Sequence, residues 1–361
     1  VLMLKKMNKT TKNNLITYAM VILAFVIMQI LISAGSISSL LQGLMVPLCT
    51  YIILAVSLNL VVGILGELSL GHAGFMCVGA FTSAFFSKCT RDVIASDGLR
   101  FFLALLIGIV TAAIFGMLIG IPVLRLKGDY LAIVTLAFGE IIKNMVNVLY
   151  IGKDSKGFHV TTKDVMALNM DADGTVILNG PQGITGTPKN STFVIGFILI
   201  LLTLFIVQNL INSRDGRAIM AIRDNRIAAE SIGINITKYK LMAFTISAAM
   251  AGAAGVLYAH NISTLTANTN NFGYNMSITI LVFVVLGGIG NIRGSIIAAV
   301  ILTLLPELLR GMKDYRMLIY AIVLIVMMLF NWSPKAIEWR EKLNDWRKKH
   351  FSFGKKAKEV E

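Results

Sequence analysis

Charged residues are scarce in this sequence. Asp, Glu, Lys and Arg make up 14% of its 361 residues, whereas hydrophobic residues make up 56%. Soluble globular domains carry about 25% charged residues, so the composition excludes an ordinary soluble domain and predicts an all-α polytopic membrane protein. Because a transmembrane helix needs about 20 apolar residues, a chain of this length has room for about ten of them.

Cysteine is almost absent. Cys49, Cys77 and Cys89 form no CxxC pair and no even disulfide framework. Two of the three lie in apolar segments, so we expect them to be small buried side chains.

Acidic residues are fewer than basic ones. The formal net charge of +14 would suggest a nucleic-acid partner in a soluble protein. Most of the basic excess lies in segments predicted to face the cytoplasm, where the positive-inside rule and anionic lipid headgroups explain it. We therefore expect contact with membrane lipid and no nucleic-acid partner.

Several enzyme motifs are missing. The sequence has no GxxxxGK[ST] phosphate loop, no HExxH, no GxSxG and no paired Cys/His ligand spacing. We therefore expect no P-loop ATP hydrolysis, no catalytic residue, no metal site and no cofactor bound by this chain.

Ten apolar segments predict ten transmembrane helices, with boundaries uncertain by several residues. They cover residues 15–33, 40–64, 68–87, 99–124, 130–150, 192–211, 241–260, 274–291, 294–311 and 316–333.

Basic residues predict the orientation of these helices. Residues 1–14 carry four lysines and no acid, and the C-terminal tail carries nine Lys or Arg against five acids, so both termini are expected in the cytoplasm. The uncharged segment 261–273 then faces outside. The sequence divides into a cytoplasmic N-terminus (1–14), a transmembrane domain (15–333) with an external loop (151–191) and a cytoplasmic loop (212–240), and a basic cytoplasmic tail (334–361).

Five predicted helices lie on each side of the external loop. Two inverted five-helix halves, as in many transport folds, are one arrangement, and a bundle without internal symmetry is the other. The support for symmetry is that glycines interrupt two junctions between spans, at 63–75 and at 287–294. Close packing of small residues is the simpler role for the second group of glycines.

The cytoplasmic loop 212–240 is the longest charge-dense stretch between apolar segments. It carries six basic and three acidic residues, and its composition predicts one helix from Arg217 to Ile232, with Asp215 as N-cap and Gly233 as C-terminal stop. It could be an ordinary charged loop or a docking helix, whose isoleucines enter a cleft of a partner while arginines reach carboxylates around it. The residues predicted for such a contact are Arg217, Ile219, Ile222, Arg223, Arg226, Glu230 and Gly233.

A glycine-rich stretch, GILGELSLGHAGF at 63–75, places Glu67, Ser69 and His72 among apolar residues. Glycines allow a helix to break where it lines a cavity, so these three polar residues are candidates for a translocation path. The alternative is a packing role, with a hydrogen-bonded His72 inside the bundle.

Another segment, GDYLAIVTLAFGEIIKNM at 128–145, carries Glu140 and Lys143. Glu140 lies about 16 Å along a helix from Asp129, and Lys143 shares its face, so the two can form an ion pair. Ionisable residues within a membrane are functional candidates, and a structural ion pair is the equally weighted alternative.

These motifs, together with GRAIMAIRDNRIAAESIGINITKYK and VVLGGIGNIRG, resemble the permeases of branched-chain amino acid ABC importers, of the LivM-like type. The resemblance covers most of 40–310. It implies a subunit of the bacterial cytoplasmic membrane whose 212–240 loop couples to a separate ATPase. It also implies a second, LivH-like permease, two ATPase subunits that bind the ATP, and an external solute-binding protein.

Other functions remain open at this stage. Related permeases carry urea, amides or nucleosides, and a stand-alone channel or secondary transporter could use Glu140 and Lys143 for ion coupling. A membrane enzyme built on His72 and Glu67 lacks a second convergent catalytic group.

Overall fold

The computed structural model describes residues 9–35, 38–126, 128–171, 174–309 and 315–332, so the predicted tail and the first eight residues lie outside it. The chain divides into two units, Val1–Val300 and Ile301–Glu361. The helices of the first unit are α1 (Lys9–Ser33), α2 (Ser39–Asn59), α3 (His72–Cys89), α4 (Asp97–Val123), α5 (Asp129–Val148), α6 (Phe193–Asn212), α7 (Arg214–Asp224), α8 (Arg226–Ser231), α9 (Ile236–Ala259), α10 (Thr269–Phe272) and α11 (Tyr274–Gly287). Helix α12 (Ile292–Leu308) begins in the first unit and ends in the second, which contains α13 (Arg316–Trp332).

Seven helical stretches of the described residues are long and apolar enough to cross a membrane. The other three predicted spans coincide with α3, α12 and α13, which are 18, 17 and 17 residues long. The prediction of a helical, multi-pass membrane protein is confirmed.

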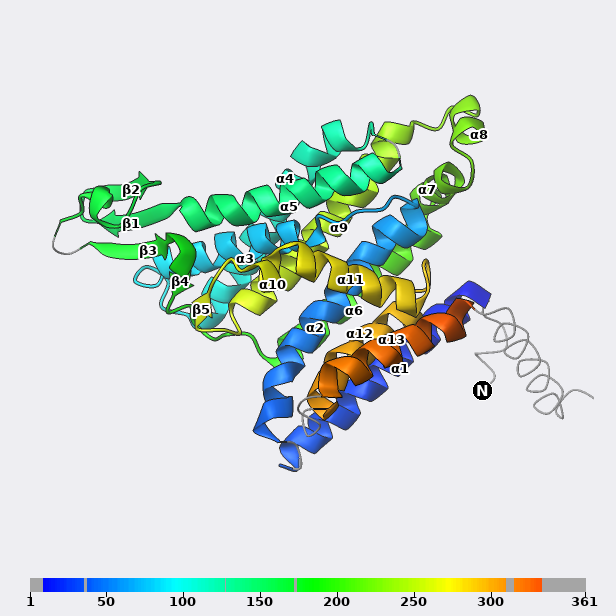
Figure 1. Cartoon of the computed structure of the whole chain (residues 1–361), viewed down its shortest axis with the longest axis horizontal. Helices are drawn as coiled ribbons and strands as arrows, with labels where there is room; N and C mark the ends of the chain where they lie inside the picture. The colour runs from blue at the N-terminus through cyan, green and yellow to red at the C-terminus, as the bar shows by residue number, and fades with distance from the viewer. Residues whose placement is uncertain (1–8, 36–37, 127, 172–173, 310–314, 333–361) are drawn as a thin grey trace, which may run out of the picture. The chain divides into compact units, whose positions relative to one another are not determined.

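Helix α9 packs against α2, α3 and α4 at the centre of the first unit (Figure 1). A Cβ on Gly79 of α3 would collide with the backbone of Gly252 in α9, and a Cβ on Gly252 would meet the carbonyl of Gly108 in α4. Small residues let helix backbones approach this closely, which increases dispersion contacts where lipid supplies no hydrophobic driving force. The run AAMAGAAG of α9 is explained by this packing.

The helix that contains α2 breaks near its end. It continues as a π-helix, η2 (Leu60–Leu65), and stops at Gly66, whose φ of 79° is left-handed. Residues 67–71 are not helical, and α3 begins at His72. The predicted span 68–87 is therefore wrong at its start, because its first residues form a non-helical connection.

The two glycine-interrupted junctions lie directly against each other. A Cβ on Gly63 would collide with the backbone of Gly290. Asn59 joins them, since its Oδ1 accepts a hydrogen bond from the Gly290 amide at 2.9 Å and its Nδ2 donates to Ser295 Oγ at 2.9 Å. We call residues 59–71 together with 287–294 the broken-helix junction.

Loops predicted to share a side of the membrane do meet in the structure. At the end opposite the junction, Asn147 Nδ2 donates to the Ala267 carbonyl at 3.0 Å and Thr187 Oγ1 to the Ile262 carbonyl at 2.6 Å. This grouping agrees with the predicted alternation of spans.

The predicted external loop contains short β-strands. Strands β1 (Tyr150–Asp154), β2 (Gly157–Thr161) and β3 (Thr175–Asn179) form an antiparallel sheet in the order β2-β1-β3, and β4 (Ile184–Thr185) pairs with β5 (Thr264–Leu265). The all-α prediction is wrong here. The β-branched and aromatic residues of these short segments favour a pleated, half-buried surface, and β4 pairs with the 261–273 loop in a separate two-stranded sheet.

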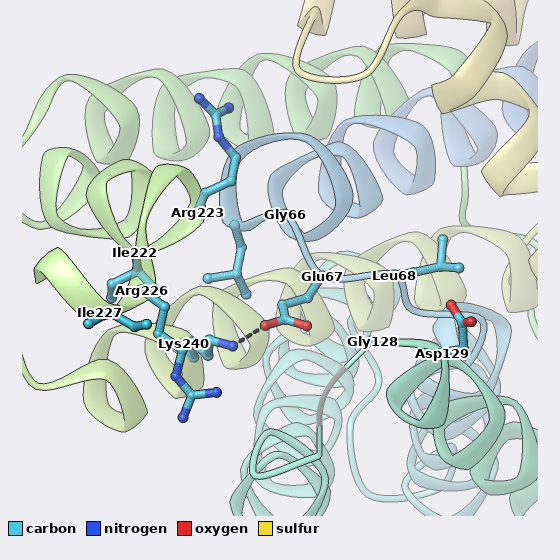
Figure 2. A pocket seen from close by; sticks show the side chains of 11 residues that line it. Gly66, Glu67, Leu68, Gly128, Asp129, Ile222, Arg223, Arg226, Ile227 and Lys240 are labelled. Carbon is cyan, nitrogen blue, oxygen red and sulfur yellow. Dashed lines mark hydrogen bonds and ion pairs between the residues drawn. The ribbon is translucent and has the colours of Figure 1, made fainter. Parts of the chain in front are cut away.

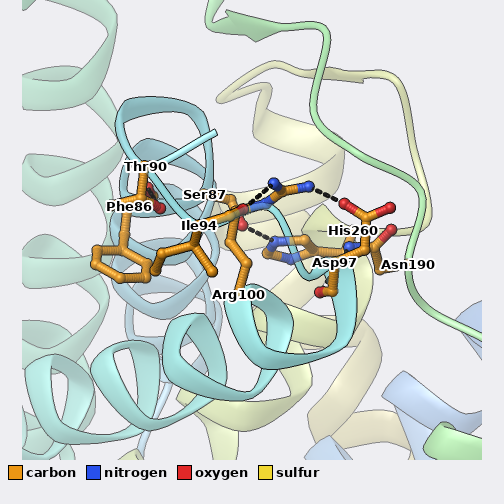
Figure 3. Close-up of polar contacts among 8 residues, drawn as sticks. All are labelled: Phe86, Ser87, Thr90, Ile94, Asp97, Arg100, Asn190 and His260. Atoms are coloured by element: carbon orange, nitrogen blue, oxygen red, sulfur yellow. Dashed lines mark hydrogen bonds and ion pairs between the residues drawn. The ribbon is translucent and has the colours of Figure 1, made fainter. Parts of the chain in front are cut away.

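A polar cluster joins α3, α4 and α9 at the end opposite the broken-helix junction (Figure 3). Ser87 Oγ lies 2.9 Å from His260 Nε2, and His260 Nδ1 lies 3.0 Å from the Val256 carbonyl. Arg100 donates to the Ile94 carbonyl at 3.0 Å and pairs with Asp97. These contacts satisfy groups that the ends of three helices would otherwise leave buried and unpaired.

Candidate functional site

The cytoplasmic loop forms two short helices instead of the one predicted. Helix α7 ends at Asp224 and α8 starts at Arg226, because Asn225 adopts an extended conformation and its side chain accepts a hydrogen bond from the Ala228 amide at 3.1 Å. Asn competes with helical backbone bonds in this way and favours helix starts. The first N-cap is Ser213, not Asp215. Gly233, with a φ of 85°, follows the end of α8 as predicted.

Ile219 and Ile222 are not available to a partner, which corrects the sequence prediction. They are 0% and 4% exposed, and Ile222 packs with Ala229 and Ile236 of this same chain. The exposed isoleucines of the loop are Ile227 (80%) and Ile232 (73%). Their hydrophobicity alone could not have distinguished the two pairs, since the break at Asn225 changes which face each residue occupies.

Arg223 connects α7 to the broken-helix junction. Its Nη1 donates to the Gly63 carbonyl at 3.0 Å, while its Nε and Nη2 contact Asp224 Oδ1 at 3.0 and 2.9 Å. A Cβ on Gly66 would collide with the Arg223 side chain. The absence of a side chain at Gly66, and its left-handed φ, therefore let the arginine cross the end of η2 and satisfy a carbonyl that the break leaves free.

Glu67 pairs with Lys240 across the junction (Figure 2). The side chains are 15% and 5% exposed, and Lys240 lies in the first turns of α9. A partly buried pair compensates two charges that would each be costly alone. The pair attaches the non-helical connection 67–71 to α9, the helix that follows the 212–240 loop.

A cavity of about 500 Å³ lies between the cytoplasmic loop and the junction. Figure 2 shows Glu67, from the junction, and Lys240, from α9, pointing toward each other at this cavity, which Arg223 of α7 and Asp129 of α5 also line. Ile222, Arg226 and Ile227 also line it. Arg217, Glu230 and Gly233, the other residues predicted for the contact, are exposed. The loop residues thus divide between contacts inside the chain and an exposed outer face.

Ser69 and His72 are both buried in the broken connection. His72 Nε2 lies 2.7 Å from Ser57 Oγ, so this imidazole has a partner in α2. Ser69 is 1% exposed, and within the described residues its hydroxyl has no hydrogen-bond partner. Glu67 and His72 therefore have side-chain partners, whereas the Ser69 hydroxyl has none among the described residues.

Glu140 and Lys143 form the predicted ion pair, with 2.5 Å between Lys143 Nζ and Glu140 Oε2. The pair also contacts a second interruption of helical structure, between α10 and α11. Glu140 Oε1 accepts a hydrogen bond from the Tyr274 amide at 2.8 Å, and Lys143 Nζ donates to Thr269 Oγ1 at 3.1 Å. A carboxylate at the first amide of α11 also interacts favourably with the helix dipole. The pair holds α5 against the start of α10 and α11.

Sequence analysis missed three residues of this site. Asn59 and Thr135 are polar residues within apolar runs, which is a usable signal; Thr135 Oγ1 accepts from the Leu70 amide at 3.0 Å. Lys240 begins an apolar run and resembles an ordinary interfacial lysine. Its partner Glu67 lies 173 residues away, so no local pattern could identify the pair. Within the described residues, no group of three His, Cys, Asp or Glu could hold a metal ion.

Comparison with known proteins identifies close relatives. The family described as "Branched-chain amino acid transport system / permease component" matches residues 39–330. The high-affinity branched-chain amino acid transport system permease protein LivM of Salmonella typhimurium is 35% identical over 363 residues, which cover 91% of this chain and 75% of that protein. LivM of Escherichia coli is 33% identical with the same coverage, and LivH of Escherichia coli is 25% identical over 70% of this chain and 79% of its own length. No solved structure matches the chain.

The Glu67–Lys240 pair gives the first prediction for the site. Lys240→Met leaves a carboxylate partly buried without its partner, which should cost roughly 3–5 kcal/mol of stability. The double variant Glu67→Gln/Lys240→Met should recover most of this loss. Thermal unfolding in detergent measures both variants, and equal stability of the single and double variants would show that the two charges do not interact.

The Glu140–Lys143 pair gives a second prediction for the site. If the pair holds α5 to α11, Glu140→Ala should destabilise the protein, because the Lys143 ammonium and the Tyr274 amide both lose an acceptor. Glu140→Gln/Lys143→Met should restore stability, and with it uptake. A double variant that unfolds like the wild type but fails to transport would instead place the pair in the translocation path.

Proposed function

The chain belongs to the family of branched-chain amino acid transport permeases, and we propose that it is a membrane-spanning subunit of an ABC importer for branched-chain amino acids. The observation that carries this proposal is the similarity to two LivM proteins over 91% of the chain. The similarity to LivH over 70% of the chain supports a pore built from two related but distinct permeases.

ATP hydrolysis is assigned to separate ATPase subunits, because the sequence has no P-loop. The cytoplasmic loop is assigned as the coupling element. Its exposed apolar side chains are Ile227, which also lines the cavity, and Ile232, and α8 carries Arg226 and Glu230 as well. Apolar anchors surrounded by charged residues fit a docking contact.

The inner face of the same loop supports a coupling role. Arg223 reaches the Gly63 carbonyl and Lys240 pairs with Glu67, so the 59–71 side of the broken-helix junction is attached to the loop at two points. Displacement of α7 by an ATPase would pull on residues 63–67 without an intermediate element. We assign this movement as the step that opens the path inward.

The translocation path is assigned to the broken connection. Ser69 supports this, since a buried hydroxyl without a partner in the described residues can bind water or a polar group of the substrate. The contact of the two glycine-interrupted junctions supports two inverted halves. We also propose that the chain crosses the bacterial cytoplasmic membrane ten times, with both termini in the cytoplasm.

The outer end is assigned to an external solute-binding protein. The three-stranded sheet projects beyond the helices there (Figure 1), and Met166, which follows β2, is 88% exposed. A flexible exposed methionine on a projecting sheet is suited to contact with a partner surface.

Replacement of the exposed isoleucines tests the function. Ile227→Asp/Ile232→Asp should leave thermal stability unchanged, since both side chains lie outside the core, but should abolish co-purification of the ATPase and ATP-driven leucine uptake in proteoliposomes with all partner subunits. Ile222→Asp is the matched control: a carboxylate at a 4% exposed position should cost several kcal/mol and prevent folding.

Normal ATPase recovery and normal uptake in the double variant would exclude α8 as the docking helix. Uptake of a nucleoside or an amide by the wild-type importer, without uptake of leucine, would exclude branched-chain amino acids as the substrate.

A further inference from the structure

An apolar groove of about 610 Å³ lies on the outer half of the first unit, apart from the coupling site. Helices α3, α4 and α5 form its walls, and the β1–β2 hairpin covers its outer end, where the rings of Phe158 and Phe85 lie 6.0 Å apart. Aromatic and aliphatic side chains line it, including Phe81, Phe115, Ile142 and Met145.

The groove follows helix α3, which is a predicted span. Its lining on α3 extends from Val78 to Cys89, the last residue of that helix. Eleven residues of helix span about 16 Å, which is close to half the hydrocarbon thickness of about 30 Å. An extended acyl chain of the outer leaflet has this length and direction.

The polar groups inside the groove are already satisfied. Thr82 Oγ1 donates to the Val78 carbonyl at 2.7 Å, Thr111 Oγ1 donates to the Ile107 carbonyl at 2.9 Å, and the two hydroxyls lie 2.9 Å apart. A ligand in this groove therefore needs no polar group of its own, as a hydrocarbon chain does not.

Two lysines lie at the outer end of the groove. Lys88 is next to Cys89 and donates to the Val176 carbonyl at 2.8 Å, and Lys153 Nζ is 5.9 Å from the Phe158 ring. Within the described residues neither forms an ion pair with an Asp or Glu. The positive-inside rule disfavours lysines beside the external ends of spans, so two uncompensated ammonium groups here indicate an anionic ligand.

We propose that this groove binds an anionic phospholipid of the outer leaflet, with an acyl chain between α3, α4 and α5 and the headgroup phosphate at Lys88 and Lys153. The apolar walls, the depth and the charged mouth all match this one class of molecule. The bound lipid would fill the space between the hairpin and α5, and so support the sheet that faces the outside. The site does not depend on which substrate the importer carries.

Photo-crosslinking tests the site in the assembled importer. Phe85 is replaced by p-benzoylphenylalanine, and the importer is placed in vesicles of phosphatidylethanolamine with a minority of phosphatidylglycerol. Phe102, which is 54% exposed on α4, gives the control for bulk lipid, and Phe244, which is 2% exposed, gives the control for the protein interior. Mass spectrometry identifies the crosslinked species. Phe115, on the α4 wall, replaces Phe85 if that variant loses thermal stability.

The expected adduct at Phe85 is phosphatidylglycerol, enriched over its share in the Phe102 adduct. Lys153→Met should reduce this enrichment roughly fivefold, the contribution of one lysine near a membrane surface, and Lys88→Met should reduce it similarly. The same lipid composition at Phe85 and Phe102, unchanged by Lys153→Met, would reduce the groove to ordinary lipid-facing surface and overturn the proposal. Adducts to a partner permease at Phe85, or none at all, would overturn it as well.

Discussion

A helix that breaks inside a membrane must find hydrogen-bond partners for the backbone groups that it frees, because lipid offers none. The connection between η2 and α3 imposes this constraint on the rest of the molecule. The Leu70 amide finds Thr135 on α5, the Ala73 amide finds Ser277 on α11 at 3.2 Å, and the Gly63 carbonyl finds Arg223 on α7. Each partner comes from a different helix, so the break can exist only where those helices meet.

This dependence works in both directions. The side chains that stabilise the break are also the contacts that position α5, α7 and α11 around it. Asn59 is the clearest case, since one side-chain amide binds Gly290 and Ser295 of the opposite junction. If segment 59–71 of the junction moves, segment 287–294 must move with it, or these hydrogen bonds must break. Alternating access requires a bundle that switches between two discrete hydrogen-bonded arrangements. A bundle that deforms gradually would not serve.

The sequence predicted features that depend on local composition. The ten apolar segments correspond to helices, Gly233 takes a left-handed φ after α8, and Glu140 pairs with Lys143 one turn away. Periodicity and spacing determine such features. The sequence failed where tertiary contacts decide. Ile222 and Ile227 are chemically identical and five residues apart, yet one lies in the core and the other is 80% exposed. Nothing local links Lys240 to Glu67 or folds residues 150–179 into a sheet.

Two charge pairs, one near each end of the first unit, accompany the two helix breaks. Glu67–Lys240 lies at the break before α3, and Glu140–Lys143 lies at the break before α11. In each pair, a lysine balances the charge of a partly buried carboxylate that lies next to non-helical backbone. The carboxylate can therefore remain ionised where it is only partly hydrated. Hydration of these pairs would weaken them, because the same Coulomb attraction is several-fold smaller in water than in protein. The strength of each pair, and of the helix contacts that it maintains, therefore depends on how much water reaches that break.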